Sequence, residues 1–370
     1  MLNIDYLYLS HINIQCSIFN THPETPGQIT LSQQLIAHLL IFDRQIYIAF
    51  AERYMNTYLK FKSAWLQLLI FGSLTFGISA ALFFIGITIV SKIYNVPPLT
   101  LATMDLTNPN VLNAAKALQV ISSIAVFLVP PLVFAYLSDR KPMEYIGFKK
   151  PVPVVFWGLS LLLIFASLPM VGWLGHMNEN LHLPASMAST EKALRDAEAQ
   201  AGKMIEKFLV MKSPADLIKM IFIVAVVPAF AEELFFRGVL QRLMIQITRR
   251  PVAGIIITAI IFSAIHGQFL GFFPRMVLGI LLGALFWYSG SLWPGILTHF
   301  VFNGAQVYLV YLNPKYATME PQYNIGLIVG STFFVLLLLY WMKHISHTHY
   351  AVVYDTDDEF TIEREPDQPE

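Results

Sequence analysis

Long apolar stretches, separated by shorter polar segments, dominate the pattern of residues along the chain. A helix that crosses a membrane needs about 20 mostly apolar residues, and several stretches approach or exceed this length. They cover residues 64–91, 113–137, 152–175, 217–242, 251–268, 273–289, 292–312 and 323–342. The pattern predicts an all-α fold, a polytopic membrane helix bundle with about eight transmembrane helices.

The composition agrees with a membrane environment. Only 13% of the 370 residues are charged and 56% are hydrophobic, whereas soluble domains carry about 25% charged residues. The formal net charge is zero, which gives no reason to expect a nucleic-acid partner. The expected partner is therefore membrane lipid.

The chain divides into three parts by composition. Residues 1–54 have mixed character and form an N-terminal extension, either a peripheral segment or the product of a start site assigned too early. Residues 55–345 hold all the predicted spans. Residues 346–370 end in an acidic segment that we expect to be a disordered cytosolic tail. Between the third and fourth spans, the polar stretch 176–213 predicts an amphipathic helix on or near the membrane.

The positions of lysine and arginine predict the orientation. Basic residues gather before the first span, between the second and third, between the fourth and fifth, and after the eighth. Such loops usually face the cytosol. We expect an integral multi-pass protein of a bacterial cell membrane with both termini in the cytosol, although the reverse orientation would place all these groups outside.

Charged residues interrupt the fourth predicted span. Glu232 and Glu233 are adjacent, and Arg237 follows four residues after Glu233. An ionised group near the centre of a spanning helix costs about 2.5–3.5 kcal/mol on insertion scales. The i,i+4 spacing puts Glu233 and Arg237 on one helix face, where they can pair. This pair could be purely structural, whereas Glu232 points about 100° away and is free for another partner.

Two further predicted spans carry histidines. His266 ends a segment that begins at Phe262, and His299 lies four residues before Asn303. A single histidine in a span is more often a packing residue than a catalyst. Polar groups on three spans can, however, satisfy one another if the helices converge. Convergence would also assemble a general base, an imidazole and hydrogen-bond donors for an oxyanion.

The ordered pattern Glu-Glu-x-x-x-Arg, Phe-x-x-x-His and His-x-x-x-Asn resembles the CPBP family of intramembrane proteases. That family includes the type II CAAX prenyl endopeptidases and the bacterial Abi and self-immunity proteins. The resemblance covers residues from about 140 to 303. It implies an intramembrane endopeptidase of CAAX-processing type that acts on a hydrophobic or membrane-tethered peptide substrate.

The resemblance also implies a role for each motif residue. Glu232 would activate a water as general base, and His266 would hold and polarise that water. His299 and Asn303 would stabilise the tetrahedral oxyanion. Supporting positions would be held by Glu233, Arg237 and Phe262.

The need for a cofactor stays open. Glu232, His266 and His299 could instead hold zinc, because two histidines and one glutamate form a known catalytic set. No His-Glu-x-x-His motif is present, and Asn303 suits an oxyanion better than zinc. The metal-free site is therefore favoured, with zinc as the alternative.

Two other functions compete with proteolysis. A catalytically silent immunity or scaffold protein could keep the family fold. A proton-coupled transporter could use carboxylates and histidines as a relay, but we find no repeated halves of the kind that many transporters show. Arg275, which follows Phe272-Phe273-Pro274, is expected only to extend towards an interface.

Overall fold

The computed structural model describes residues 58–60, 62–102, 105–148, 152–317 and 322–348. Every regular element in these ranges is helical. The predicted N-terminal extension, residues 1–54, lies outside the described residues, and so do residues 349–370 of the predicted tail. The prediction of an all-α, polytopic bundle is confirmed.

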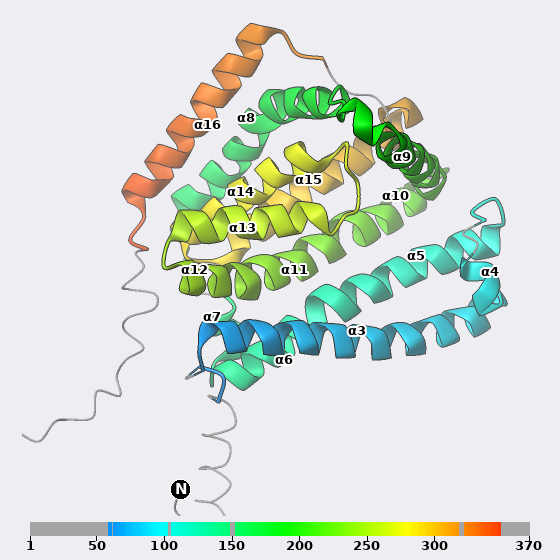
Figure 1. Cartoon of the computed structure of the whole chain (residues 1–370), viewed down its shortest axis with the longest axis horizontal. Coiled ribbons are helices and arrows are strands. Elements are labelled where there is room, and N and C mark those ends of the chain that lie inside the picture. Colours follow the sequence, from blue (N-terminus) through cyan, green and yellow to red (C-terminus); the bar gives the residue numbers. More distant parts are fainter. Residues whose placement is uncertain (1–57, 61, 103–104, 149–151, 318–321, 349–370) are drawn as a thin grey trace, which may run out of the picture. The chain divides into compact units, whose positions relative to one another are not determined.

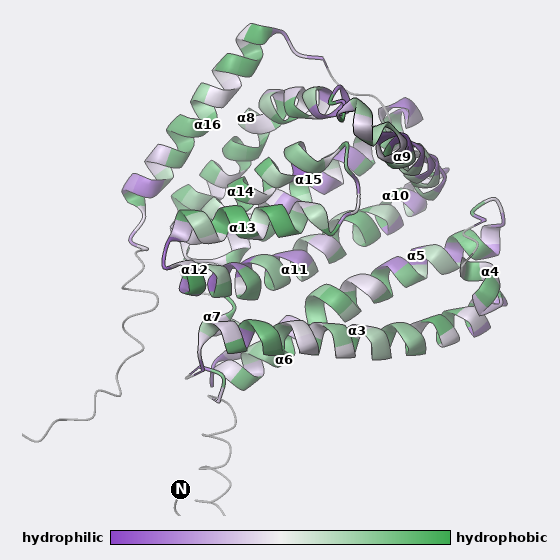
Figure 2. Ribbon diagram, in the orientation of Figure 1, coloured by the Kyte–Doolittle hydropathy of each residue, from purple (hydrophilic) through white to green (hydrophobic). Residues whose placement is uncertain are grey.

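In the part of the chain that the structure describes, six helices are long and apolar enough to cross a membrane. Most of these helices are coloured green, the hydrophobic end of the scale, along much of their length in Figure 2. The second of them joins α5 (Pro109–Ser123), the π-helical turn η1 (Ile124–Leu128) and α6 (Val129–Ser138). The others are α3 (Ala64–Tyr94), α8 (Val154–Glu179), α14 (Phe272–Ser289), α15 (Leu292–Leu312) and α16 (Ile325–Ile345).

The fourth and fifth predicted spans differ from simple spanning helices. The fifth is only the 14-residue helix α13 (Pro251–Ala264), about 21 Å long at 1.5 Å per residue. A helix of this length does not match a hydrocarbon core of about 30 Å. The fourth is a continuous helical run (Figure 1) built from α10 (Pro214–Ile221), η3 (Phe222–Val226), α11 (Val227–Glu233), η4 (Leu234–Gln241) and α12 (Arg242–Thr248).

The polar stretch between α8 and α10 contains the predicted helix. It is α9 (Ala188–Phe208), which has no buried residue and is largely purple, the hydrophilic colour, in Figure 2. Glu191 fixes its start by accepting hydrogen bonds from the Leu183 N–H, from Arg195 and from His182, and these lower the pKa of Glu191 to about 2. The shorter elements are α4 (Pro98–Ala102), α7 (Pro142–Tyr145), η2 (Ala185–Met187) and η5 (Pro314–Ala317).

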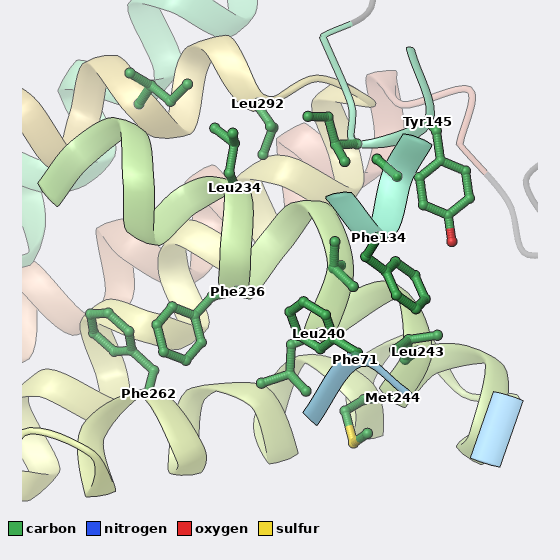
Figure 3. Packing of buried hydrophobic residues seen from close by; sticks show 14 of the residues in the cluster. Phe71, Phe134, Tyr145, Leu234, Phe236, Leu240, Leu243, Met244, Phe262 and Leu292 are labelled. Atoms are coloured by element: carbon green, nitrogen blue, oxygen red, sulfur yellow. The ribbon is translucent and has the colours of Figure 1, made fainter. Parts of the chain in front are cut away.

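Aromatic side chains pack the helices around the fourth span. Phe236 and Phe262 meet edge to face with ring centroids 4.9 Å apart, and Figure 3 shows them side by side. The rings of Phe71 and Phe134 lie 5.3 Å apart in the same cluster. Because lipid is as apolar as these side chains, close van der Waals packing holds such helices together. The cluster fixes the end of α13 against the run that carries the two glutamates.

A glycine brings α13 against α12. A Cβ atom at Gly254 would lie 2.5 Å from the Ile245 side chain and 2.8 Å from its Cα. Only the missing side chain permits this approach, in the manner of small residues at helix contacts in membranes. The glycine therefore lets the start of α13 pack directly against α12.

Candidate active site

The two glutamates lie at the end of α11, between the π-helical segments η3 and η4. π-helical turns are rare, and they occur frequently at functional sites. A proline, Pro228, occupies the first turn of α11. It has no N–H, so the carbonyl four residues before it, at Val224, loses the partner that an α-helix would supply.

Glu233 and Arg237 form a buried ion pair. Arg237 Nη1 lies 3.0 Å from Glu233 Oε1, and their side chains are 1% and 0% exposed. Arg237 Nη2 also donates to the Gly279 carbonyl of α14 at 3.2 Å, and the guanidinium lies 4.9 Å from the Phe262 ring centroid. The pair therefore joins the fourth span to α13 and α14.

His299 of α15 lies between the two glutamates. Its Nδ1 is 3.0 Å from Glu233 Oε1, and its Nε2 is 3.9 Å from Glu232 Oε2. An ionised carboxylate only accepts hydrogen bonds, so Nδ1 carries the hydrogen of the shorter contact. The other glutamate oxygen, Glu233 Oε2, would be 3.2 Å from a Cβ at Gly295, so glycine at this position lets α15 approach the carboxylate.

Glu232 differs from its neighbour in access. Its side chain is 14% exposed, and among the described residues its closest ionic contact is the 3.9 Å approach to His299. A contact of that length is too long for a direct hydrogen bond and is the distance at which a bridging water must be considered. Glu232 can therefore meet a small molecule that Glu233 cannot reach.

His266 lies beyond the helix predicted to contain it. The fifth span was predicted to extend to residue 268, but α13 ends at Ala264, and His266 is exposed in the following turn. Its Nδ1 lies 2.7 Å from the Phe262 carbonyl oxygen. Because a carbonyl only accepts, Nδ1 carries the hydrogen, and Nε2 of the neutral ring is left as an acceptor.

Phe262 connects the two histidines. Its ring centroid lies 5.0 Å from that of His266 and 6.4 Å from that of His299. The imidazoles thus flank a single aromatic ring, with Arg237 also packed against it. The structure brings together residues from α11, η4, α15 and the turn after α13.

Asn303 satisfies the carbonyl that Pro228 releases. Its Nδ2 donates to the Val224 oxygen at 3.1 Å. This contact supplies a structural reason for an asparagine in α15. An amide nitrogen has two hydrogens, so the second stays available to another acceptor.

Sequence analysis missed the support of the loop between α13 and α14. Asn178, which is fully buried, donates through Nδ2 to the Phe269 carbonyl at 3.0 Å and accepts from the Phe273 N–H at 2.9 Å. Ser263 Oγ donates to the Phe272 carbonyl at 2.6 Å. The loop that follows His266 is therefore held at both ends.

Arg275 was expected only to extend towards an interface, but it also makes hydrogen bonds within the protein. Its Nη2 donates to Gln268 Oε1 at 2.8 Å, and Gln268 Nε2 donates to Glu198 Oε1 at 3.1 Å. Arg275 is thus part of a polar chain that links α14, the loop after His266 and α9. An arginine inside an apolar segment is by itself an indication of function. Sequence analysis interpreted Arg275 only as an interfacial side chain and did not use this indication.

The alternative zinc site would need three donor side chains close to one another. Within the described ranges, no three His, Cys, Asp or Glu side chains group as a metal site requires. His299 Nδ1 is engaged by Glu233, which leaves Nε2 of each histidine as a candidate ligand. The residues as placed do not form a zinc site, and we derive no step through a metal.

Comparison with known proteins identifies the segment that holds these residues. Residues 214–305 match the family model described as type II CAAX prenyl endopeptidase Rce1-like. The matched segment, which is less than half of the chain, is similar to that family. No curated protein and no solved structure matches the chain.

The type II CAAX prenyl endopeptidase-like segment extends from α10 into α15. It includes every predicted site residue, from Glu232 to Asn303, and so confirms the resemblance drawn from the three motifs. Together with the apolar helices, the match indicates an integral multi-pass membrane protein and a CAAX-type intramembrane protease.

Proposed function

We propose that the protein hydrolyses a peptide bond with a water activated by Glu232. The observation that carries this proposal is the contrast between the adjacent glutamates. Glu233 is sealed in contacts with Arg237 and His299, whereas the Glu232 side chain is 14% exposed beside His299. A general base must reach the proton that it abstracts, and only Glu232 has that access.

The proposed reaction begins with a water held by two acceptors. Glu232 and Nε2 of His266 accept its two hydrogens, which directs an oxygen lone pair towards the substrate carbonyl. Glu232 takes one proton as the oxygen bonds to the carbonyl carbon. The same proton then passes to the leaving nitrogen as the C–N bond breaks, giving a carboxylic acid and an amine.

The developing oxyanion requires hydrogen-bond donors. We assign this role to the second amide hydrogen of Asn303 and to His299 Nε2 in the doubly protonated ring, because Nδ1 already carries the hydrogen of a neutral ring. The first amide hydrogen holds Asn303 against Val224, and Glu233 holds the other side of the His299 ring. Donors fixed in advance cost no reorganisation during the reaction.

The proposed substrate is a hydrophobic or membrane-tethered peptide, including a prenylated CAAX-type peptide. The apolar helices around the site favour a substrate that is already in the bilayer, and membrane lipid is the expected partner. We retain a bacterial membrane with cytosolic termini as the proposed setting. Metal-free catalysis is also part of the proposal.

Cleavage of a farnesylated reporter peptide by purified full-length protein tests the function. The peptide carries a fluorophore and a quencher on opposite sides of the scissile bond, and mass spectrometry identifies the products. Wild type should cleave it, and Glu232→Gln should reduce turnover by about 10²–10⁴, the usual contribution of a general base. Full activity in a well-folded Glu232→Gln protein would remove Glu232 from this role.

A further inference from the structure

A cavity lies outside the candidate active site, between α9 and the segment that leads into α5. It has a volume of about 280 Å³ and is lined by Leu106, Gln200, Lys203, Met204 and Lys207. All of these residues except Leu106 come from the C-terminal half of α9. The wall therefore combines two positive charges and an amide with two apolar side chains.

The two lysines differ from the charged residues at the other end of α9. Glu191 and Arg195 are spaced i,i+4 and form an ion pair at 2.9 Å. Lys203 and Lys207 have the same spacing but like charges, an arrangement that destabilises a helix. Within the described residues, neither lysine lies within ion-pair distance of a carboxylate. An anion that contacted both ammonium groups would relieve their repulsion.

The acidic groups near the cavity do not cancel its charge. Asp105 interacts electrostatically with Lys207, but its Oδ1 accepts hydrogen bonds from the hydroxyl and the backbone N–H of Thr107 at 2.5 and 3.1 Å. These bonds lower the pKa of Asp105, which therefore supplies one negative charge against two positive ones. Glu206 of α9 is exposed and does not line the cavity.

The cavity lies where the membrane-spanning region begins. Leu106 shortly precedes α5, and the second candidate span starts with α5 at Pro109. The helix α9 has no buried residue, and Met204 beside the lysines is 40% exposed. A ligand in the cavity would thus meet apolar side chains and ammonium groups together, at the level where a bilayer places its polar headgroups.

We propose that this cavity binds the phosphate of an acidic phospholipid. Lys203 and Lys207 contact the phosphate, since lysine binds this group as a compact charge, and Gln200 donates a hydrogen bond to the headgroup. The start of the acyl chains covers Leu106 and Met204, which a soluble phosphate would leave in water. The proposal is independent of proteolysis, because no residue of the candidate active site takes part in it.

Lipid titration of the full-length protein in a neutral detergent tests the proposal. Phosphatidylglycerol and phosphatidylcholine with the same acyl chains are added separately, and native mass spectrometry measures the dissociation constant of the first bound lipid. Wild type should bind phosphatidylglycerol about 30-fold more tightly, which corresponds to about 1 kcal/mol for each lysine. The double variant Lys203→Gln/Lys207→Gln should bind the two lipids equally. A preference that survives in this variant would overturn the proposal.

Three variants of α9 separate a defined site from a general charge effect. Lys192→Gln removes an exposed lysine near the start of α9 and should keep the full preference. The double variant Lys203→Arg/Lys207→Arg keeps both charges and should keep it too. Lys203→Glu gives this position the acidic–basic order of Glu191 and Arg195, so it should remove the preference. If Lys192→Gln weakened the preference as much as the double glutamine variant, no defined site would exist.

Thermal unfolding provides a readout that a structural role of the lysines would not produce. Without added lipid, the double glutamine variant should unfold at or slightly above the wild-type temperature, because the like-charge pair is gone. Phosphatidylglycerol should raise the midpoint of wild type only, since a ligand stabilises the state that binds it. An equal rise in both proteins would overturn the proposal.

Glycerol phosphate and inorganic phosphate identify the source of the bound group. Both carry the phosphate without acyl chains, so each should bind wild type far more weakly than phosphatidylglycerol does. If either bound as tightly as the lipid, the ligand would be a soluble phosphate, and the proposal of a lipid site would be wrong.

Discussion

Glu232 and Glu233 are neighbours in the sequence, yet they lie in two very different surroundings. Glu233 is enclosed by Arg237, His299 and the backbone of α15 at Gly295. The Glu232 side chain is 14% exposed, and this more open side is where we propose that the catalytic water meets His266. One carboxylate therefore holds helices together, while the other is available for chemistry. Under the proposed function, a single turn of helix thus separates support from catalysis.

Mutation of the enclosed carboxylate, Glu233, should lower the stability of the protein. Glu233→Gln removes the partner of a guanidinium that stays buried, and loss of one member of a buried pair costs about 3–5 kcal/mol. We expect a large fall in the thermal unfolding midpoint in detergent. Glu232→Gln is the matched control and should unfold near the wild-type temperature. Equal losses of stability in Glu233→Gln and Glu232→Gln would contradict the distinction between the two carboxylates.

Mutation of the proposed oxyanion donors, His299 and Asn303, should lower turnover. His299→Ala and Asn303→Ala should each lower kcat by about 10²–10³, the cost of removing one oxyanion donor. His299→Ala should also lower stability, because it leaves Glu233 with one partner fewer. Single-turnover kinetics with the reporter peptide measures the first effect. Variants with normal kcat and raised KM would show that these residues only bind substrate.

The order of the loop that follows His266 should depend on its hydrogen bonds to Asn178. Asn178→Ala leaves the Phe269 carbonyl and the Phe273 N–H without their partner, at a cost of about 1–3 kcal/mol. Hydrogen exchange of residues 265–273 should become faster, with exchange in α11 unchanged. Asn180→Ala removes an exposed asparagine two residues away and is the control. Unaltered exchange in Asn178→Ala would mean that the loop is held by other contacts.

Chelation should have the smallest effect. If Glu232 acts as a base without metal, prolonged treatment with EDTA and 1,10-phenanthroline should leave turnover unchanged. Elemental analysis of the purified protein should then find zinc well below one equivalent. Activity that disappears with zinc removal and returns with zinc would instead make Glu232, His266 and His299 ligands, and the open side would be a metal site.

The sequence predicted the helical architecture because long apolar segments have few alternatives in a membrane. It also placed Glu233 and Arg237 on one face, since i,i+4 spacing is a local property. The predicted end of the fifth span, residue 268, was wrong. The apolar run continues past Ala264, but the helix ends there. The sequence alone could not separate Glu232 from Glu233 with assurance, because access depends on α15.

Other features needed the tertiary structure. Asn178 meets Phe269 across 91 residues, and no pattern within a helix reports such a contact. The π-helical segments beside α11 are likewise invisible in apolar periodicity. The sequence partly indicated the hydrogen bond between Asn303 and Val224, because Pro228 leaves the Val224 carbonyl without its helical donor. Nothing in the sequence, however, identifies the side chain that donates to this carbonyl instead.

The irregular turn at Pro228 also has an evolutionary consequence. Replacing the proline with alanine would restore an N–H beneath Val224, and the helix could close its own hydrogen bond. Removing a proline from within a helical run usually makes the helix itself more stable. Here it would release Asn303 and weaken the link between α15 and α11. Selection for a more regular helix would thus act against selection for a working site, and the defect can persist because the chain benefits from it.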